Sequence, residues 1–161
     1  MIKAIIVDFG GVVLVPRSQE EKERWAARFR LPYHALIDLL YEGEAWQLAR
    51  IGRISDDEFW RRVGPLVGLS DEEEIRAFAR EFFATEEARL NQPLLDLLAE
   101  LRPQYKIALL SNASDRLEGV LEHKLGILDH FDLVVNSARV GLAKPDLAIY
   151  ELTLERLGVL S

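Results

Sequence analysis

Three short runs of apolar residues, each bounded by polar or turn-forming residues, stand out along the chain. They occupy residues 2–7, 106–110 and about 133–136. Apolar runs of roughly four to eight residues fit strands better than helices. Runs that are continuous rather than alternating indicate strands covered on both faces. We therefore predict a parallel sheet built on these three segments.

The chain between the first and second runs has a helical pattern throughout, from about residue 16 to 87. Two sequences within it, Ser55–Glu58 and Ser70–Glu73, place Glu three residues after Ser, which is the spacing of a capping box and predicts two helix starts. We therefore predict an all-helical insert at 16–87, which divides an α/β core into residues 1–15 and 88–161.

Three further helices are predicted after the insert. The first spans about 93–102, the second spans 114–125 and ends at Gly126, and the third begins at Pro145 and ends at Gly158. Glycine is common just after a helix, where a left-handed residue closes the last turn. Strands that alternate with helices in this way are typical of a parallel α/β fold.

Composition excludes several classes of protein. The 161 residues carry a net charge of −7, which argues against general affinity for nucleic acid. No apolar run approaches the roughly 20 residues of a membrane span. The chain has no cysteine, so it has neither disulfides nor sites built on thiolates. We expect a cytoplasmic protein without nucleic-acid or membrane partners.

Candidate chemistry gathers where the apolar runs end. Asp8 directly follows the first run and precedes Gly10 and Gly11, while Ser111 and Asn112 close the second run. Ligands of open α/β sheets bind just beyond the carboxyl ends of the strands. Asp8 would thus face a bound ligand, and Gly10 and Gly11 would let this ligand approach the backbone closely. The alternative is a turn aspartate that only caps the strand end.

A third feature is the loop Gly141–Asp146, which delivers Lys144 just before a helix. Asp8, Ser111 and Lys144, in this order, resemble the first three motifs of the haloacid dehalogenase-like hydrolase superfamily. The stretch from His130 through Tyr150 is especially similar, and the resemblance covers the whole chain. It implies a Rossmann-like three-layer core with a helical cap at 16–87.

The resemblance also implies a reaction. Asp8 would attack a small phosphorylated metabolite and form an aspartyl-phosphate, and Lys144 would offset the repulsion between the two anions. Ser111, Asn112 and the backbone of Gly11 would bind the phosphate. Mg²⁺ would be held by Asp8 and by the carbonyl of Gly10. Without the resemblance, Ser111 could be a helix cap and Lys144 a solvated loop lysine.

Two departures from the family pattern weaken this interpretation. Gly10 stands where most of these phosphatases carry an aspartate that protonates the leaving group, and His34 is the candidate substitute. The fourth motif, an acidic loop that completes the Mg²⁺ site, has no counterpart before Ser161. We therefore expect a C-terminally truncated chain with impaired activity. We also expect a homodimer formed through the exposed sheet edge left beside residues 3–7.

Two other functions remain open at this point. One is a catalytically incompetent binding or interaction module that keeps the fold. The other is a 2-haloacid dehalogenase, which resembles the phosphatases in its aspartate nucleophile and needs no metal, although such enzymes usually carry an aromatic residue at the position of Gly10. Substrate contacts would come from the cap, where Trp46 and Arg50 are candidates that could equally serve packing and the surface.

Overall fold

A computed structural model describes residues 1–84 and 89–159 of the chain. The expected boundary of the cap at residues 87 and 88, like Ser161, lies outside these described residues. Three strands form one parallel sheet in the order β1-β2-β3: β1 Ala4–Val7, β2 Lys106–Ser111 and β3 Leu133–Asn136. The α/β fold class and all three strands expected from the apolar runs are confirmed.

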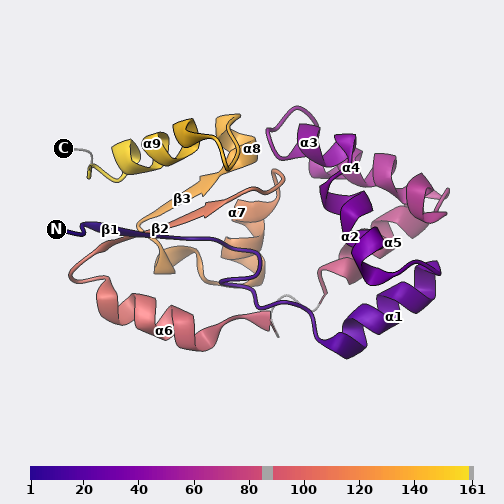
Figure 1. Ribbon diagram of the computed structural model, residues 1–161, viewed down its shortest axis with the longest axis horizontal. Coiled ribbons are helices and arrows are strands. Elements are labelled where there is room, and N and C mark those ends of the chain that lie inside the picture. The colour runs from indigo at the N-terminus through magenta and orange to yellow at the C-terminus, as the bar shows by residue number, and fades with distance from the viewer. Residues whose placement is uncertain (85–88, 160–161) are drawn as a thin grey trace.

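Helices cover both faces of this sheet (Figure 1). One face carries α6 Gln92–Leu101, α7 Leu117–Gly119 and the π-helical turn η3 Val120–Lys124, with the short η4 Leu128–His130 nearby. The other carries α8 Ser137–Val140 and α9 Leu147–Arg156. Each side has its own buried apolar cluster, the larger around Leu109 and Leu121 and the smaller around Leu110 and Ile149. The core is therefore three-layered.

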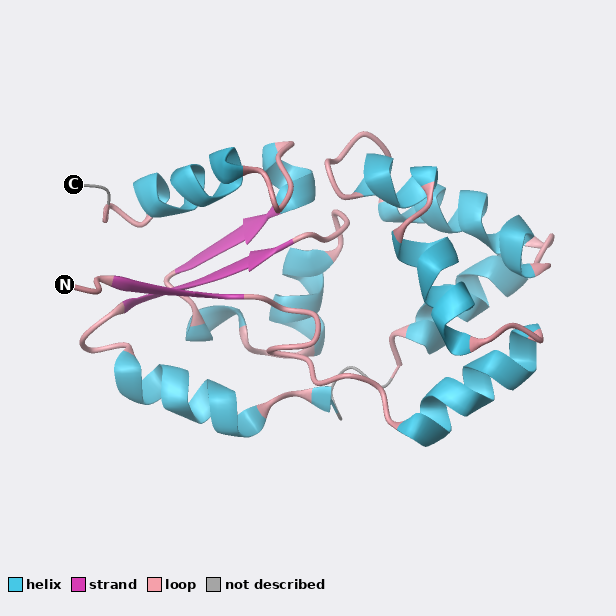
Figure 2. Cartoon of the chain, in the orientation of Figure 1, coloured by secondary structure: helices cyan, strands magenta, loops and turns pink. Residues whose placement is uncertain are grey.

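The helices between β1 and α6 form a separate lobe, called the helical lobe below (Figure 2). Its elements are α1 Gln19–Phe29, α2 Tyr33–Tyr41, α3 Glu44–Ala49, α4 Asp56–Val63, η1 Gly64–Val67 and α5 Glu72–Phe82. Aromatic rings fill its centre. Trp25 and Trp60 both pack against Phe78 and Phe82, at centroid distances of 5.3–5.9 Å. Such pairs add to the free energy of burial. No helix among the described residues has the length and apolar character to cross a membrane.

The helix starts in this lobe differ in part from the expected ones. Ser55 accepts a hydrogen bond from the N–H of Glu58, but only this half of the expected box is formed. The start expected at Ser70 is wrong by one residue, because Asp71 is the cap and accepts from the N–H groups of Glu73 and Glu74. An Asp beside a Ser can take the cap position equally well, since both side chains accept backbone N–H bonds.

The helix expected from residue 114 is also wrong at its start. It begins only at Leu117 and continues as a π-helical turn to Lys124. Ser114 does not cap it, since the hydroxyl of Ser114 donates to Asp56 of the helical lobe instead. The last helix likewise begins after Pro145, with Asp146 accepting from the N–H of Ala148 at its cap. In the first case a contact between lobes replaces a local helix cap.

Gly52, in the turn between α3 and α4, lies against the core. It has a φ of +71°, and a Cβ at this position would lie 2.1 Å from the carbonyl oxygen of Ala138 in α8. A side chain here must push the helical lobe and the core apart. The contact therefore requires glycine both for its backbone conformation and for its lack of a side chain.

We expect Gly52→Ala to lower the free energy of unfolding by about 2–4 kcal/mol, from steric overlap added to left-handed strain. Gly68→Ala is the matched control, because Gly68 also has a positive φ, of +83°, but has open space where a Cβ would stand. It should cost about 1–2 kcal/mol. Urea unfolding of both variants measures the difference, and equal losses would contradict a tight contact at Gly52.

Candidate active site at the carboxyl edge of the sheet

Asp8 and Lys144 form an ion pair where the first strand ends. The Nζ of Lys144 lies 2.6 Å from Oδ2 of Asp8, although the two residues lie far apart in the sequence. The same Nζ donates to the carbonyl of Leu110 at 3.0 Å, which fixes the ammonium against the end of β2. The lysine side chain is 19% exposed and the aspartate 41%. A positive charge is thus held beside a carboxylate that remains open to solvent.

Asn112 holds the loop that carries Lys144. Its side-chain oxygen accepts the backbone N–H of Lys144 at 2.8 Å, and its Nδ2 donates to the carbonyl of the same residue at 3.0 Å. We call this pair of bonds the Asn112 clamp. The amide expected to bind phosphate therefore has both of its polar atoms engaged with the lysine backbone. A role of Asn112 in phosphate binding stays a prediction, whereas its positioning of Lys144 is a feature of the structure.

The turn after β1 presents the other oxygen of the carboxylate. Oδ1 of Asp8 accepts the N–H of Phe9 at 2.8 Å, which orients the side chain. Gly11 has a φ of +79°, and both Gly10 and Gly11 are exposed and face open space where a side chain would stand. A ligand can therefore approach the backbone of this turn closely.

A cavity of about 240 Å³ lies between the core and the helical lobe, and we call it the inner cavity. The core contributes Gly10 and Ser111 to its lining, together with Asn112. Ser111 is the last residue of β2 and is buried, and the described residues offer its hydroxyl no side-chain hydrogen bond. The helical lobe contributes the aromatic residues Tyr41, Trp46, Phe59, Trp60 and Phe82. The polar groups Ser111 and Asn112 thus share one cavity with the aromatic side chains of the helical lobe.

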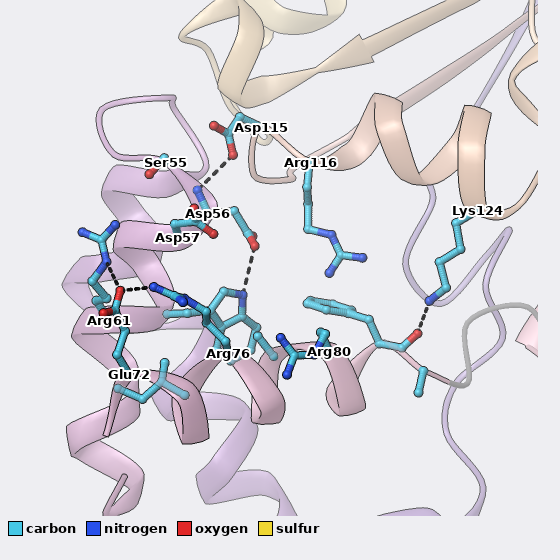
Figure 3. Close-up of a pocket in the computed structure, with 15 residues that line it drawn as sticks. Ser55, Asp56, Asp57, Arg61, Glu72, Arg76, Arg80, Asp115, Arg116 and Lys124 are labelled. Carbon is cyan, nitrogen blue, oxygen red and sulfur yellow. Dashed lines mark hydrogen bonds and ion pairs between the residues drawn. The ribbon is translucent and has the colours of Figure 1, made fainter. Parts of the chain in front are cut away.

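A larger cavity of about 730 Å³ opens between α4, α5 and the segment from Asp115 to Lys124 (Figure 3). We call it the outer cavity. Charged side chains of both signs line it. Asp56, Trp60, Phe83 and Arg116 line both cavities, so these side chains separate the two. The guanidinium of Arg116 lies 3.6 Å from the ring centroid of Phe83, which joins the core to the end of α5.

Asp56 makes polar contacts between the lobes. Its Oδ1 accepts from the hydroxyl of Ser114 at 2.5 Å, its Oδ2 accepts from Trp60 Nε1 at 3.1 Å, and its backbone N–H donates to Asp115 at 2.9 Å. Burial raises the pKa of this carboxyl above its ordinary value of 3.8. The Ser114 bond and the charge of Arg116 act against the rise, while the charge of Asp115 adds to it.

The raised pKa of Asp56 predicts a pH dependence with a definite sign. The folded state binds the Asp56 proton more tightly than the unfolded state, so ionisation on raising the pH lowers the free energy of unfolding. Asp56→Asn lacks this ionisation. Its stability relative to wild type should therefore rise as the pH increases from about 4 to 7. Denaturant unfolding over this range measures the trend, and a flat difference would contradict it.

Asp132→Asn is the control for this trend, with the opposite sign. The backbone N–H of Ile107 and the charge of Arg102 lower the pKa of Asp132 below 3.8, although burial opposes them. The stabilisation that Asp132 provides is complete above its unfolded pKa and is lost as the pH falls through the folded one. Its Asn variant should therefore lose stability relative to wild type as the pH rises through the acidic range.

The residues that the sequence suggested for substrate contact and for the general acid differ in their distance from the cavities. Trp46 lines the inner cavity, whereas Arg50 lines neither cavity. His34 is exposed on α2 and also lines neither, so the structure does not support it as the missing acid. Sequence analysis missed Asp56, which it took as part of a helix cap, and Arg17, which is buried beside the inner cavity. No local sequence signal distinguishes either residue from a surface charge.

The oxygen ligands for Mg²⁺ are few. No group of three or more His, Cys, Asp or Glu side chains in residues 1–84 and 89–159 could hold a metal ion. Asp8 could supply one carboxylate and the exposed Gly10 one backbone carbonyl, as predicted from the sequence. Mg²⁺ is commonly bound by one or two carboxylates together with substrate phosphate and water. The residues present fit such a sparse site.

Comparison with known proteins identifies the family of this chain. A family model described as a haloacid dehalogenase-like hydrolase matches residues 2–160. The pyrimidine 5'-nucleotidase YjjG of Escherichia coli is 36% identical over 81 residues, which cover 48% of this chain and 36% of that protein. The match thus spans about a third of the length of that relative.

Solved structures give the same fold. A haloacid dehalogenase family enzyme of Bacteroides thetaiotaomicron superposes with a TM-score of 0.71 at 22% identity, covering 99% of this chain and 80% of that one. The same enzyme has also been solved as a complex with magnesium and inorganic phosphate. L-2-haloacid dehalogenase of Xanthobacter autotrophicus, with chloropropionic acid covalently bound, gives 0.64 at 26% identity, covering 99% and 66%.

Proposed function

The chain belongs to the haloacid dehalogenase-like hydrolase family, and from this premise we propose that it is a phosphatase of small phosphorylated metabolites with Asp8 as its nucleophile. The observation that carries the proposal is the ion pair of Asp8 with Lys144 at the carboxyl edge of the sheet. An anionic nucleophile that attacks an anionic phosphate needs a fixed positive charge beside it, and Lys144 supplies one.

The first step would transfer the phosphoryl group to the protein. A carboxylate oxygen of Asp8 forms a bond to phosphorus, the bond from phosphorus to the ester oxygen breaks, and the alcohol leaves with a proton taken from solvent. Lys144 and the hydroxyl of Ser111 stabilise the phosphoryl oxygens, while the Gly10–Gly11 turn lets them approach backbone N–H groups. In the second step water attacks the phosphorus, releases inorganic phosphate and restores the Asp8 carboxylate.

Mg²⁺ would complete this arrangement through Asp8 and the Gly10 carbonyl. When bound, it neutralises charge on the phosphoryl oxygens and aligns them with the nucleophile. With only two protein ligands, we expect an affinity for Mg²⁺ in the millimolar range. The nucleotidase among the relatives supports phosphate esters as the substrate class, and the solved relative with magnesium and phosphate supports the cofactor.

The direct test is release of p-nitrophenol from p-nitrophenyl phosphate across a Mg²⁺ titration. We expect turnover that rises with Mg²⁺ and is lost on chelation. Fluoride release from fluoroacetate without metal tests the dehalogenase alternative in parallel. Metal-independent fluoride release without phosphatase activity would replace the proposed reaction. Folded protein without either activity would favour an interaction module.

The lack of a side-chain acid at Gly10 predicts a dependence on the leaving group. When p-nitrophenyl phosphate is cleaved, the p-nitrophenolate anion is stable enough to leave without a proton. The alkoxide from an alkyl phosphate is not, so it needs an acid to protonate it. General acid catalysis is typically worth about 10²–10⁴-fold, so we expect p-nitrophenyl phosphate to be turned over faster than an alkyl phosphate by a factor of this order. Equal rates for the two esters would indicate an acid that this mechanism lacks.

We further propose that the helical lobe acts as a cap that covers the active site. Its aromatic residues form one wall of the inner cavity, and closure of such a lobe would exclude water from the phosphoryl transfer. The contacts through Asp56 and Gly52 hold the lobe on the core. Substrate-dependent protection of these contacts from hydrogen exchange would be the expected sign of closure.

We also propose a homodimer formed through β1. This strand lies at the end of the described sheet and is only partly buried along its length, whereas β2 is buried from Ile107 to Ser111. Unpaired edges invite strand addition from a second chain. Light scattering after size exclusion should give the mass of a dimer. Ile2→Lys, which places charge at an exposed residue beside the strand, should shift it towards monomer. A wild-type monomer would contradict this proposal.

A further inference from the structure

Arg17 is a buried cation at the entry to the helical lobe. It lies between β1 and α1, immediately before the Ser18 cap, and is only 9% exposed. No ion pair of Arg17 is found in residues 1–84 and 89–159. Burying a charge without a partner is costly, because the interior cannot replace the water that solvated it. This cost calls for an explanation.

The contacts of Arg17 hold the guanidinium in place without neutralising it. One Nη donates to the backbone carbonyl of Phe82, and the guanidinium lies over the Phe82 ring at 3.9 Å from its centroid. Nε is buried and has no hydrogen-bond acceptor among the described residues. A carbonyl and an aromatic face attract a cation but carry no net charge. The group is therefore fixed, and among the described residues one donor has no acceptor and no anion pairs with the charge.

Arg17 also lines the inner cavity, the one that contains Gly10 and Ser111. Arg50 also has a buried Nε without a hydrogen-bond partner among the described residues. Arg50 is less buried and lines neither cavity. Of the two, only Arg17 combines deep burial and an unused donor with a place in the lining of the inner cavity. Gly10 and Asn112, which lie beside Asp8 and Lys144 in the site, line the same cavity.

We propose that Arg17 binds a second anionic group on the substrate, a carboxylate or a phosphoryl group, when the scissile phosphoryl group lies at Asp8. This inference rests on the proposed phosphatase function and narrows the substrate to small phosphorylated acids. The volume of about 240 Å³ favours a compact molecule. A guanidinium held in one orientation matches carboxylate and phosphate oxygens better than a flexible ammonium does.

Binding of non-hydrolysable phosphonates tests this without turnover. Phosphonoacetate and 3-phosphonopropionate each carry a carboxylate, at two different lengths, and in the corresponding amides only this carboxylate is replaced by a neutral group of the same shape. We expect calorimetry with Mg²⁺ present to give one of these acids an affinity about 10–100-fold higher than its amide, the usual worth of a charged hydrogen bond. Methylenebisphosphonate tests a second phosphoryl group, and tighter binding than phosphonoacetate would identify that as the preferred anion.

Arg17→Gln should remove the preference for the anion and leave the affinity for the amide unchanged. Arg17→Lys keeps the charge without the fork and should retain part of the preference. This second variant keeps the test decisive if Gln disturbs folding. Arg24→Gln, at an exposed arginine of α1 that lines neither cavity, is the matched control and should bind as wild type does.

The inference is overturned if wild type binds every anionic probe no better than its neutral counterpart, if no phosphonate binds, or if Arg17→Gln weakens acid and amide alike. These outcomes are separate from failure of the proposed function. If wild type does not hydrolyse p-nitrophenyl phosphate, the phosphatase proposal fails, yet the affinities still decide whether Arg17 recognises an anion.

Discussion

Asp8→Asn should lower phosphatase turnover by about 10⁴-fold or more, the range seen when a nucleophile is removed from an active site. The amide has nearly the shape of the carboxylate but cannot attack phosphorus and form the covalent intermediate. The fold should survive, because the Asp8 side chain is 41% exposed and exposed ion pairs contribute little to stability. The measurement is kcat with p-nitrophenyl phosphate at saturating Mg²⁺.

Asp38→Asn, at an exposed residue of α2, is the control and should be as active as wild type. A covalent test complements the rates: rapid quenching of wild type during turnover should trap a phosphorylated Asp8 peptide that is absent from the Asn variant. Near-normal turnover of Asp8→Asn with a normal thermal unfolding curve would show that Asp8 is not the nucleophile.

Lys144→Met should lower kcat/KM by roughly 10²–10³-fold, which is the loss typical when one preorganised donor to a transition state is removed. Methionine keeps an unbranched apolar stem of four atoms like that of lysine, so the loop can stay in place through the Asn112 clamp. What disappears is the charge 2.6 Å from Asp8 and the bond to the carbonyl of Leu110. The effect should fall mainly on the chemical step.

Lys3→Met is the matched control, since Lys3 is exposed at the start of the sheet and far from the ends of the strands where Asp8 lies. It should leave kcat/KM within about twofold of wild type, as expected for a surface substitution that touches no bound group. If Lys144→Met changed only the thermal stability, Lys144 would be a structural partner of Asp8 rather than part of the catalytic machinery.

The sheet and the convergence on Asp8 followed from the sequence because local pattern and topology determine them. Continuous apolar runs can be buried only inside a layered fold, and parallel strands bring their carboxyl ends to one edge. The positions of Asp8 and Ser111 at this edge therefore followed from the apolar runs alone. Lys144 needed the resemblance to a family, since a lysine in a loop has no local signal that distinguishes it from a surface charge.

Apart from the cap at Asp71, the main features that escaped prediction depend on contacts between distant segments. Ser114 was assigned to a helix start, but Asp56 of the helical lobe competes for its hydroxyl and the helix begins later. The burial of Arg17 depends on the position of Phe82, 65 residues further along the chain. Gly52 resembles an ordinary turn glycine until Ala138 is placed against it. Such pairings are set by tertiary packing, which local sequence does not reveal.

The Asn112 clamp has a consequence for which residues the site can accept. The side chain of Asn112 bonds both the N–H and the carbonyl of Lys144. In a sheet, the backbone of a neighbouring strand would provide this donor and this acceptor. A carboxylate offers no donor and a hydroxyl is too short to reach both groups, so only a carboxamide meets both demands. The loop needs no sheet pairing of its own at Lys144. The clamp therefore holds the backbone of Lys144, and with it the ammonium, without the help of a strand.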